Sequence, residues 1–205
     1  MRKTGPVNDF APTPHGASAA GVLVRPAEPG DAARVARLLT LRGTSVEESR
    51  EQAHRMISSL PVLLLALLPA AEAAGGEGPA GGGRAADLDY DLLAPVALSG
   101  AFPLPRRLRA SLPEPGDGVE AWMVSGLVLD PVARRGGVGR VLLTAVADAV
   151  RALRPAADLY SVVNATNHAS IGLHLMVGFK RLARLGAFGT VTFEDGQGVL
   201  LRRAG

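Results

Sequence analysis

A strand, a glycine-rich turn and a long helix follow one another between residues 121 and 153, and this unit constrains the fold more than any other segment. Ala121–Leu129 is rich in Val, Leu and Trp, which favours a buried strand. Along Val138–Leu153 the apolar residues recur at helical spacing and form one continuous stripe. Gly126 interrupts the strand, and a glycine at such a position is typical of a bulge.

The rest of the chain mixes short strands with helices. Strands are expected at 22–25, 62–68, 92–102, 159–163, 180–185, 190–193 and 199–202. Helices are expected from 31 to 43, from the capping box Ser45-x-x-Glu48 to residue 60, and at 170–177. Asp195-Gly196 predicts a hairpin that joins the last two strands. This order predicts an α/β (α+β) fold, a central sheet with helices on both faces.

The chain length of 205 residues suits one domain with appendages. Residues 1–21 are rich in Pro, Gly, Ser and Ala and predict a flexible N-terminal arm, which leaves 22–205 as a single domain. Six of the nine residues from 75 to 83 are glycine, so 72–86 is expected to be a flexible loop. A basic loop rich in Pro and Arg is expected at 103–118. It is either a solvated surface loop or a binding site for an acidic ligand, and the first is favoured because most runs of charged residues are simply exposed.

Composition excludes several classes of function. The chain has no cysteine, which excludes a disulfide scaffold, a zinc-thiolate site and a cysteine nucleophile. A net charge of +3 and 4% aromatic residues argue against nucleic-acid binding. The longest apolar run, residues 61–71, is shorter than the roughly 20 residues that span a membrane, and no signal-peptide core follows Lys3. We therefore expect a soluble cytoplasmic protein with no metal, no nucleic-acid partner and no membrane partner.

The turn before the long helix has the chemistry of an anion site. Three glycines in four positions, Gly136, Gly137 and Gly139, remove side chains that would keep a ligand from the backbone. The first N–H groups of the helix lack internal partners and lie at the positive end of its dipole. Arg134, Arg135 and Arg140 add full positive charges. These charges favour a phosphate-binding turn over a tight turn that binds no ligand. The spacing matches neither a Walker loop nor a dinucleotide fingerprint.

Two motifs in this region resemble those of one enzyme superfamily. Arg134-x-x-Gly137-x-Gly139 after Leu127-Val128-Leu129-Asp130-Pro131 is similar to the acetyl-CoA motif of the GNAT N-acetyltransferases. The segment from Asn167 to His174, followed by Gly178-Phe179, resembles the family's Asn-x-x-Ser-x-x-Leu-Tyr-x-x-x-Gly-Phe pattern. The similarity runs from about residue 22 to 181 and is densest from 124 to 179. Two such motifs in order, about thirty residues apart, are far more specific than either alone.

The resemblance implies a GNAT-like, mixed and mostly antiparallel sheet whose fourth and fifth strands splay apart beyond a bulge. The pantetheine arm of acetyl-CoA, the expected co-substrate, would lie in that cleft, and Gly126 independently fits the bulge. By the same resemblance, the cofactor-binding residues are Leu127, Val128, Leu129, Arg134, Arg135, Gly136, Gly137, Val138, Gly139, Arg140, Asn167 and Ser170.

Two residues are candidates for catalysis, each with an alternative. His174 occupies the position of the family's acidic tyrosine, a departure that is similar to the phosphinothricin-type branch. It could protonate the leaving thiolate, or it could merely pack or hydrogen-bond the cofactor. Glu120 is the nearest acidic candidate for a base, although an ordinary surface carboxylate is the more common state of such a residue. A water chain is the alternative base.

The resemblance implies an acetyl-CoA-dependent N-acetyltransferase that acts directly on a primary amine of a small molecule or peptide. The alternative is a non-catalytic acyl-CoA-binding or regulatory module of the same fold. The amine acceptor is expected to contact residues 40–60 and 106–118, and a homodimer is possible in this family.

Overall fold

The computed structural model describes residues 21–70, 92–113, 119–193 and 196–205. The expected arm and the glycine-rich loop at 72–86 lie outside these residues, apart from Gly21. The strands are β1 (Leu23–Pro26), β2 (Val62–Pro69), β3 (Leu93–Pro103), β4 (Ala121–Leu129), β5 (Asp158–Asn164), β6 (Lys180–Leu185), β7 (Ala187–Phe188), β8 (Val191–Thr192) and β9 (Gly198–Arg203). The helices are α1 (Ala32–Thr40), α2 (Val46–Ser59), α4 (Arg106–Arg109), α5 (Val138–Leu153) and α6 (His168–Met176), with 3-10 turns η1 (Pro29–Asp31) and η3 (Pro131–Ala133).

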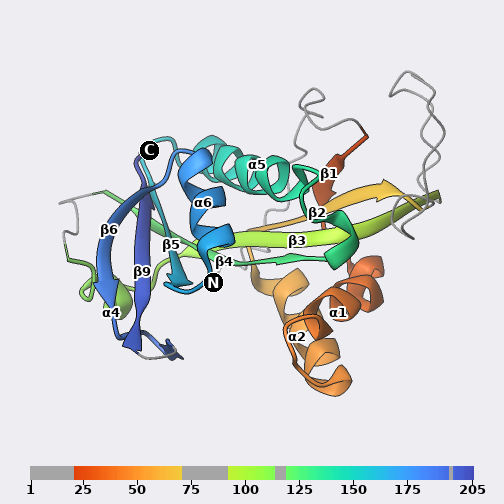
Figure 1. Cartoon of the computed structure of the whole chain (residues 1–205), viewed down its shortest axis with the longest axis horizontal. Coiled ribbons are helices and arrows are strands. Elements are labelled where there is room, and N and C mark those ends of the chain that lie inside the picture. The colour runs from red at the N-terminus through yellow and green to blue at the C-terminus, as the bar shows by residue number, and fades with distance from the viewer. Residues whose placement is uncertain (1–20, 71–91, 114–118, 194–195) are drawn as a thin grey trace, which may run out of the picture.

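Seven strands form one sheet in the order β1-β2-β3-β4-β5-β9-β6. Every neighbouring pair is antiparallel except β4 and β5, which run parallel. The helices α5 and α6 cover one face, and α1 and α2 cover the other (Figure 1). The predicted mixed, mostly antiparallel sheet with helices on both faces is confirmed.

The strand β2 shows why a sheet with two covered faces produces an unbroken apolar sequence. Leu64 and Ala66 pack in the core beneath α5, whereas Leu63, Leu65 and Leu67 pack against α1 and α2. Because both faces are buried, every position is apolar and the alternation of a half-exposed strand disappears.

The strands β4 and β5 separate soon after they meet, as the resemblance predicted. They pair only from Ala121 opposite Asp158 to Met123 opposite Tyr160, although both strands continue. Beyond this point Ser125 and Gly126 together oppose one residue of β3, which is a bulge. Gly126 has φ +112°, a conformation that disfavours any side chain. The extra residue increases the local twist and turns the end of β4 away from β5.

One sequence prediction is wrong because the place of a strand in a sheet depends on distant packing. The segment at 190–202 is not a hairpin: β8 pairs with β7, while β9 inserts between β5 and β6. Buried Val199, Leu200 and Leu201 explain why β9 takes an internal place in the sheet. The expected basic loop at 103–118 contains the one-turn helix α4, which lies beside a small apolar cluster that includes Leu104 and Leu112; residues 114–118 lie outside the described part.

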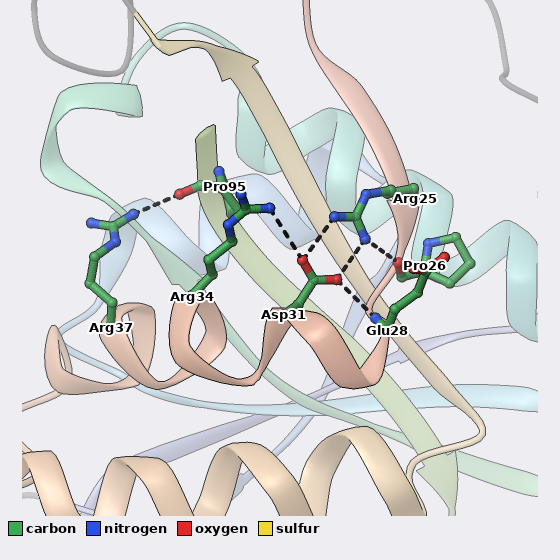
Figure 2. Close-up of polar contacts among 7 residues, drawn as sticks. All are labelled: Arg25, Pro26, Glu28, Asp31, Arg34, Arg37 and Pro95. Atoms are coloured by element: carbon green, nitrogen blue, oxygen red, sulfur yellow. Dashed lines mark hydrogen bonds and ion pairs between the residues drawn. The ribbon is translucent and has the colours of Figure 1, made fainter. Parts of the chain in front are cut away.

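A partly buried ion pair joins the first strand to the first helix. Asp31 accepts two hydrogen bonds from Arg25, at 2.6 and 2.8 Å, and a third from the backbone N–H of Glu28 at 2.9 Å (Figure 2). Burial alone would raise the pKa of Asp31, but the bonds from Arg25 and Glu28 outweigh it and lower the pKa. This contact fixes the start of α1 against β1.

Candidate functional site

A cavity of ≈ 820 Å³ lies beside the separated end of β4, between the start of α5 and α6. Nine of the twelve residues expected to bind the cofactor line it; Val128, Gly136 and Val138 do not. The lining residues are Leu127, Leu129, Arg134, Arg135, Gly137, Gly139, Arg140, Asn167, Ala169, Ser170, Leu173 and Met176.

The turn that enters α5 has an unusual backbone. Gly137 precedes the helix with φ +79°, and Arg135 has φ +68°. Arg135 is the one residue other than glycine with a positive φ in the described part of the chain. Such a conformation costs of order 1–3 kcal/mol and is frequent at ligand sites. The result is a tight loop that wraps around one end of the cavity.

The backbone N–H groups of this loop are free to bind a ligand. The amides of Arg140 and Val141 donate to the carbonyl of Gly137 at 3.0 and 3.1 Å, which closes the first turn of α5. No protein acceptor is found for the amides of residues 135–139 within the described ranges. Together with the positive end of the α5 dipole, these donors suit a phosphate group.

Gly139 also has a packing reason that the sequence did not reveal. A Cβ at this position would lie 3.0 Å from Leu173 Cδ2 and 3.2 Å from Leu129 Cδ2. The absence of a side chain therefore allows α5 to approach both β4 and α6, and Gly139, Leu129 and Leu173 together line one part of the cavity.

Three arginines surround the cavity without a carboxylate partner. Arg134, Arg135 and Arg140 are exposed, and none has an ion pair with any acid that the structure describes. The nearby Asp130 is instead engaged by Arg37, whose Nη1 donates to it at 2.9 Å and whose Nη2 donates to Pro95 O at 2.6 Å (Figure 2 shows the second bond). The three remaining charges repel one another, so an anion in the cavity would be stabilised.

The open edge of β4 provides further polar groups. Asp130 N–H donates to Val96 O at 2.8 Å, and backbone direction alternates along a strand. The amide and carbonyl of Val128 therefore face β3, whereas those of Leu127 and Leu129 face the side from which β5 has withdrawn. The expectation that all three residues present their backbones to the cleft does not fit this alternation at Val128, whose side chain packs toward α1.

Asn167 and Ser170 form the beginning of α6. Asn167 Oδ1 accepts the backbone N–H of Ser170 at 3.1 Å, so the asparagine is the helix cap. Both residues also line the cavity. The motif asparagine thus has a structural role in addition to the expected contact with the cofactor.

His174 lies behind the cavity wall. It is 2% exposed and does not line the cavity. Its Nδ1 is 2.7 Å from Ser170 O and its Nε2 is 2.9 Å from Ser161 Oγ. The carbonyl requires the proton on Nδ1, so Nε2 accepts from the serine hydroxyl. Burial lowers the pKa of His174, which favours this neutral form and the packing alternative.

Glu120 lies at the wrong end of β4 for a role at the cavity. Its carbonyl accepts the N–H of Asp158 at 2.9 Å, where β4 and β5 are still paired. Its carboxylate accepts from Trp122 Nε1 at 3.0 Å and pairs with Arg154 at 3.1 Å. Leu127 lies seven residues further along the strand, about 23 Å away at the usual rise. The structure therefore does not bring Glu120 together with the other candidates.

Sequence reasoning missed three cavity residues and one neighbour of the bulge. Ala169, Leu173 and Met176 line the cavity from α6, which helical spacing alone could have suggested once the face of that helix was known. Arg42, in the connection between α1 and α2, lies against Gly126, and no local pattern indicates this.

Two kinds of feature are absent from the described residues. No helix there is long and apolar enough to cross a membrane. No three His, Asp or Glu side chains in those ranges are grouped in a way that could hold a metal ion.

Comparisons with known proteins agree with this fold. The model of the Acetyltransferase (GNAT) family matches residues 95–179. A GNAT acetyltransferase from Bacillus anthracis superposes with a TM-score of 0.60 at 10% identity, covering 91% of this chain and 96% of that one. A phosphinothricin acetyltransferase from Sinorhizobium meliloti, in complex with AcCoA, superposes with a TM-score of 0.59 at 17% sequence identity, covering 89% of this chain and 88% of that one. Ribosomal-protein-alanine N-acetyltransferase from Brucella melitensis superposes with a TM-score of 0.56 at 17% sequence identity, covering 89% of this chain and 99% of that one. No curated protein sequence matches.

Proposed function

We propose that this chain is an acetyltransferase of the GNAT family, whose model matches residues 95–179, and that it transfers an acetyl group from acetyl-CoA directly to a primary amine of a small molecule or peptide. One observation carries the proposal. A single cavity combines free backbone N–H groups, three arginines without carboxylate partners and the open edge of a strand. The similar Sinorhizobium meliloti enzyme was solved in complex with AcCoA, the same co-substrate.

The residues present fit acetyl-CoA. The amides of residues 135–139 would bind its pyrophosphate, and Arg134, Arg135 and Arg140 would neutralise the phosphate charges. The backbone groups of Leu127 and Leu129 would pair with the amides of the pantetheine arm, in the place where a further strand would otherwise lie. Asn167 and Ser170 would contact the arm from α6.

The reaction forms one bond and breaks one. The lone pair of a neutral amine attacks the acetyl carbonyl carbon, a C–N bond forms, and the C–S bond then breaks. The amine loses a proton, and the thiolate gains one to leave as CoA-SH. Since the chain contains no cysteine, no acetyl-cysteine intermediate can form, which is consistent with the proposed direct transfer. A backbone N–H on the open edge of β4 would polarise the carbonyl.

Water is the proposed carrier of both protons. No Asp, Glu or His is found among the described residues that line the cavity. His174 has both ring nitrogens engaged, and Glu120 lies at the paired end of β4. The rate should therefore follow the fraction of neutral amine and rise toward alkaline pH.

The same observation favours a second candidate, a non-catalytic acyl-CoA-binding module. A cavity without a lining acid or base could bind the thioester and leave it intact. The two candidates differ in turnover and not in binding.

A screen of primary amines with acetyl-CoA, read by the release of free thiol and by mass spectrometry of the products, tests the proposal. Acetylation of at least one amine well above the rate in buffer is the expected result. Binding of acetyl-CoA by calorimetry without acetylation of any amine would replace the enzyme with the binding module.

A further inference from the structure

A guanidinium lies at the bulge on the face of the sheet opposite the cavity. A Cβ on Gly126 would be 3.5 Å from Arg42 Nη1 and 3.8 Å from its Cζ and Nη2. Arg42 follows α1, which packs on the face that buries Val128. The cavity, by contrast, is lined by residues of α5 and α6, the helices that cover the other face of the sheet (Figure 1). An anion can bind at this second face only if Arg42 is not already paired with a carboxylate.

The contacts of Arg42 leave its guanidinium free. Within residues 21–60 every other arginine pairs with a carboxylate: Arg25 and Arg34 with Asp31, Arg37 with Asp130, Arg50 with Glu47, and Arg55 with Glu51. Figure 2 shows two of these pairs, those of Arg25 and Arg34. Arg42 is exposed and has no carboxylate partner in the part of the chain that the structure describes.

The backbone that carries Arg42 is held in place. Its N–H donates to Leu39 O at 3.0 Å, and Gly43, with φ +85°, donates to Thr40 O at 3.0 Å. The hydroxyl of Thr44 is 3.0 Å from Leu39 O and 2.8 Å from the hydroxyl of the buried Ser49. A short connection fixed in this way defines where the Arg42 side chain leaves the backbone, so less backbone entropy is lost when a ligand binds.

We propose that Arg42 binds the carboxylate of the amine acceptor, and that the acceptor is a small amino acid rather than a neutral amine or a peptide amide. The proposal rests on the proposed function, since it assigns the acceptor to the face opposite the cavity. Gly126 directly precedes Leu127, whose backbone lines the open edge. An anion at Arg42 is therefore within a few bonds of an amine at that edge, as in an amino acid. The guanidinium fork suits a carboxylate, which it can bind through two parallel hydrogen bonds.

Matched acceptors test this proposal. The wild-type protein and the variants Arg42→Gln, Arg42→Lys and Arg50→Gln are assayed with each proteinogenic amino acid and with its carboxamide. Arg50→Gln is the control, because it removes the same charge from an exposed position on α2. We expect the wild type to prefer the free acids. Arg42→Gln should raise their KM about 10- to 100-fold and leave the carboxamides and the Kd of acetyl-CoA nearly unchanged. Arg42→Lys should recover part of the loss.

Two results would overturn the proposal: acetylation of neutral amines without any free amino acid, or an equal effect of Arg42→Gln on acids and carboxamides. If the wild type acetylates nothing, the proposed function fails, and the role of Arg42 is then decided by binding. Calorimetry with the same amino acids in the presence of CoA should show binding to the wild type and at least tenfold weaker binding to Arg42→Gln. Equal binding to both proteins, or binding to neither, would refute the role.

Discussion

Replacement of His174 by Phe separates a structural role from a catalytic one. The imidazole joins α6 to β5 by accepting a hydrogen bond from Ser161 and donating one to the carbonyl of Ser170. The Ser161 hydroxyl would lose its acceptor in a buried place, which costs about 1–3 kcal/mol, and the loss of the second bond adds about 0.5–1.5 kcal/mol. The ring contact with Phe179, now 5.1 Å between centroids, could be kept by a phenyl ring. The free energy of unfolding should therefore fall by roughly 1.5–4.5 kcal/mol.

Urea unfolding followed by circular dichroism measures this loss, and the exposed His168 provides a matched control in His168→Phe, which should change stability little. Steady-state kinetics under conditions where the variant stays folded should show kcat within about tenfold of the wild type, since no proton passes through the ring. A His174→Phe protein that keeps its stability but loses kcat by about a hundredfold or more would refute this reasoning and make His174 the acid.

Three further predictions concern stability. Burial lowers the pKa of His174, so the unfolded chain binds a proton that the folded chain does not. The free energy of unfolding should therefore fall as the pH drops through the ordinary histidine range near 6.5 toward the lowered pKa, and His174→Phe should flatten this slope in urea titrations. Gly139→Ala should lower the free energy of unfolding by about 1–3 kcal/mol, because the added Cβ meets two leucines. Gly172→Ala, whose Cβ would have no atom within 4 Å, should raise it by up to about 1 kcal/mol. Equal melting temperatures of the two variants would contradict the packing argument. Asp31→Asn should lower the free energy of unfolding by about 1–3 kcal/mol at neutral pH, where the lowered pKa keeps Asp31 charged. The difference from the wild type should vanish as the pH falls through that pKa. An unchanged melting temperature at neutral pH would exclude this role of Asp31.

The sequence predicts best those elements whose residues carry their own reason for the local structure. Both β4 and α5 begin and end where the pattern of apolar residues places them, and the capping box at Ser45 and Glu48 forms as expected. Gly126 could be assigned to a bulge because a glycine weakens the interior of a strand, so its place inside a strongly apolar strand indicates an irregular backbone.

The failures concern features that depend on residues far apart in the chain. The place of β9 in the sheet depends on its pairing with β5 and β6, which are its neighbours there. The turn signal at Asp195-Gly196 contains no information about these partners. Glu120 lies next to the correct strand, but the sequence does not say which end of that strand opens. The direction of His174 depends on the register of α6 over β5, and the contact of Arg42 with Gly126 depends on how α1 packs beneath the bulge.

Binding of acetyl-CoA to the arginine-lined turn is the central claim, and calorimetry with two ligands tests it most directly. Acetyl-CoA carries the pyrophosphate, whereas S-acetylpantetheine lacks it. The double variant Arg134→Gln/Arg140→Gln should bind acetyl-CoA at least about tenfold more weakly than the wild type, while Arg151→Gln, at the far end of α5, should not. Both variants should bind S-acetylpantetheine as the wild type does. An unchanged Kd of acetyl-CoA in the double variant would contradict the account.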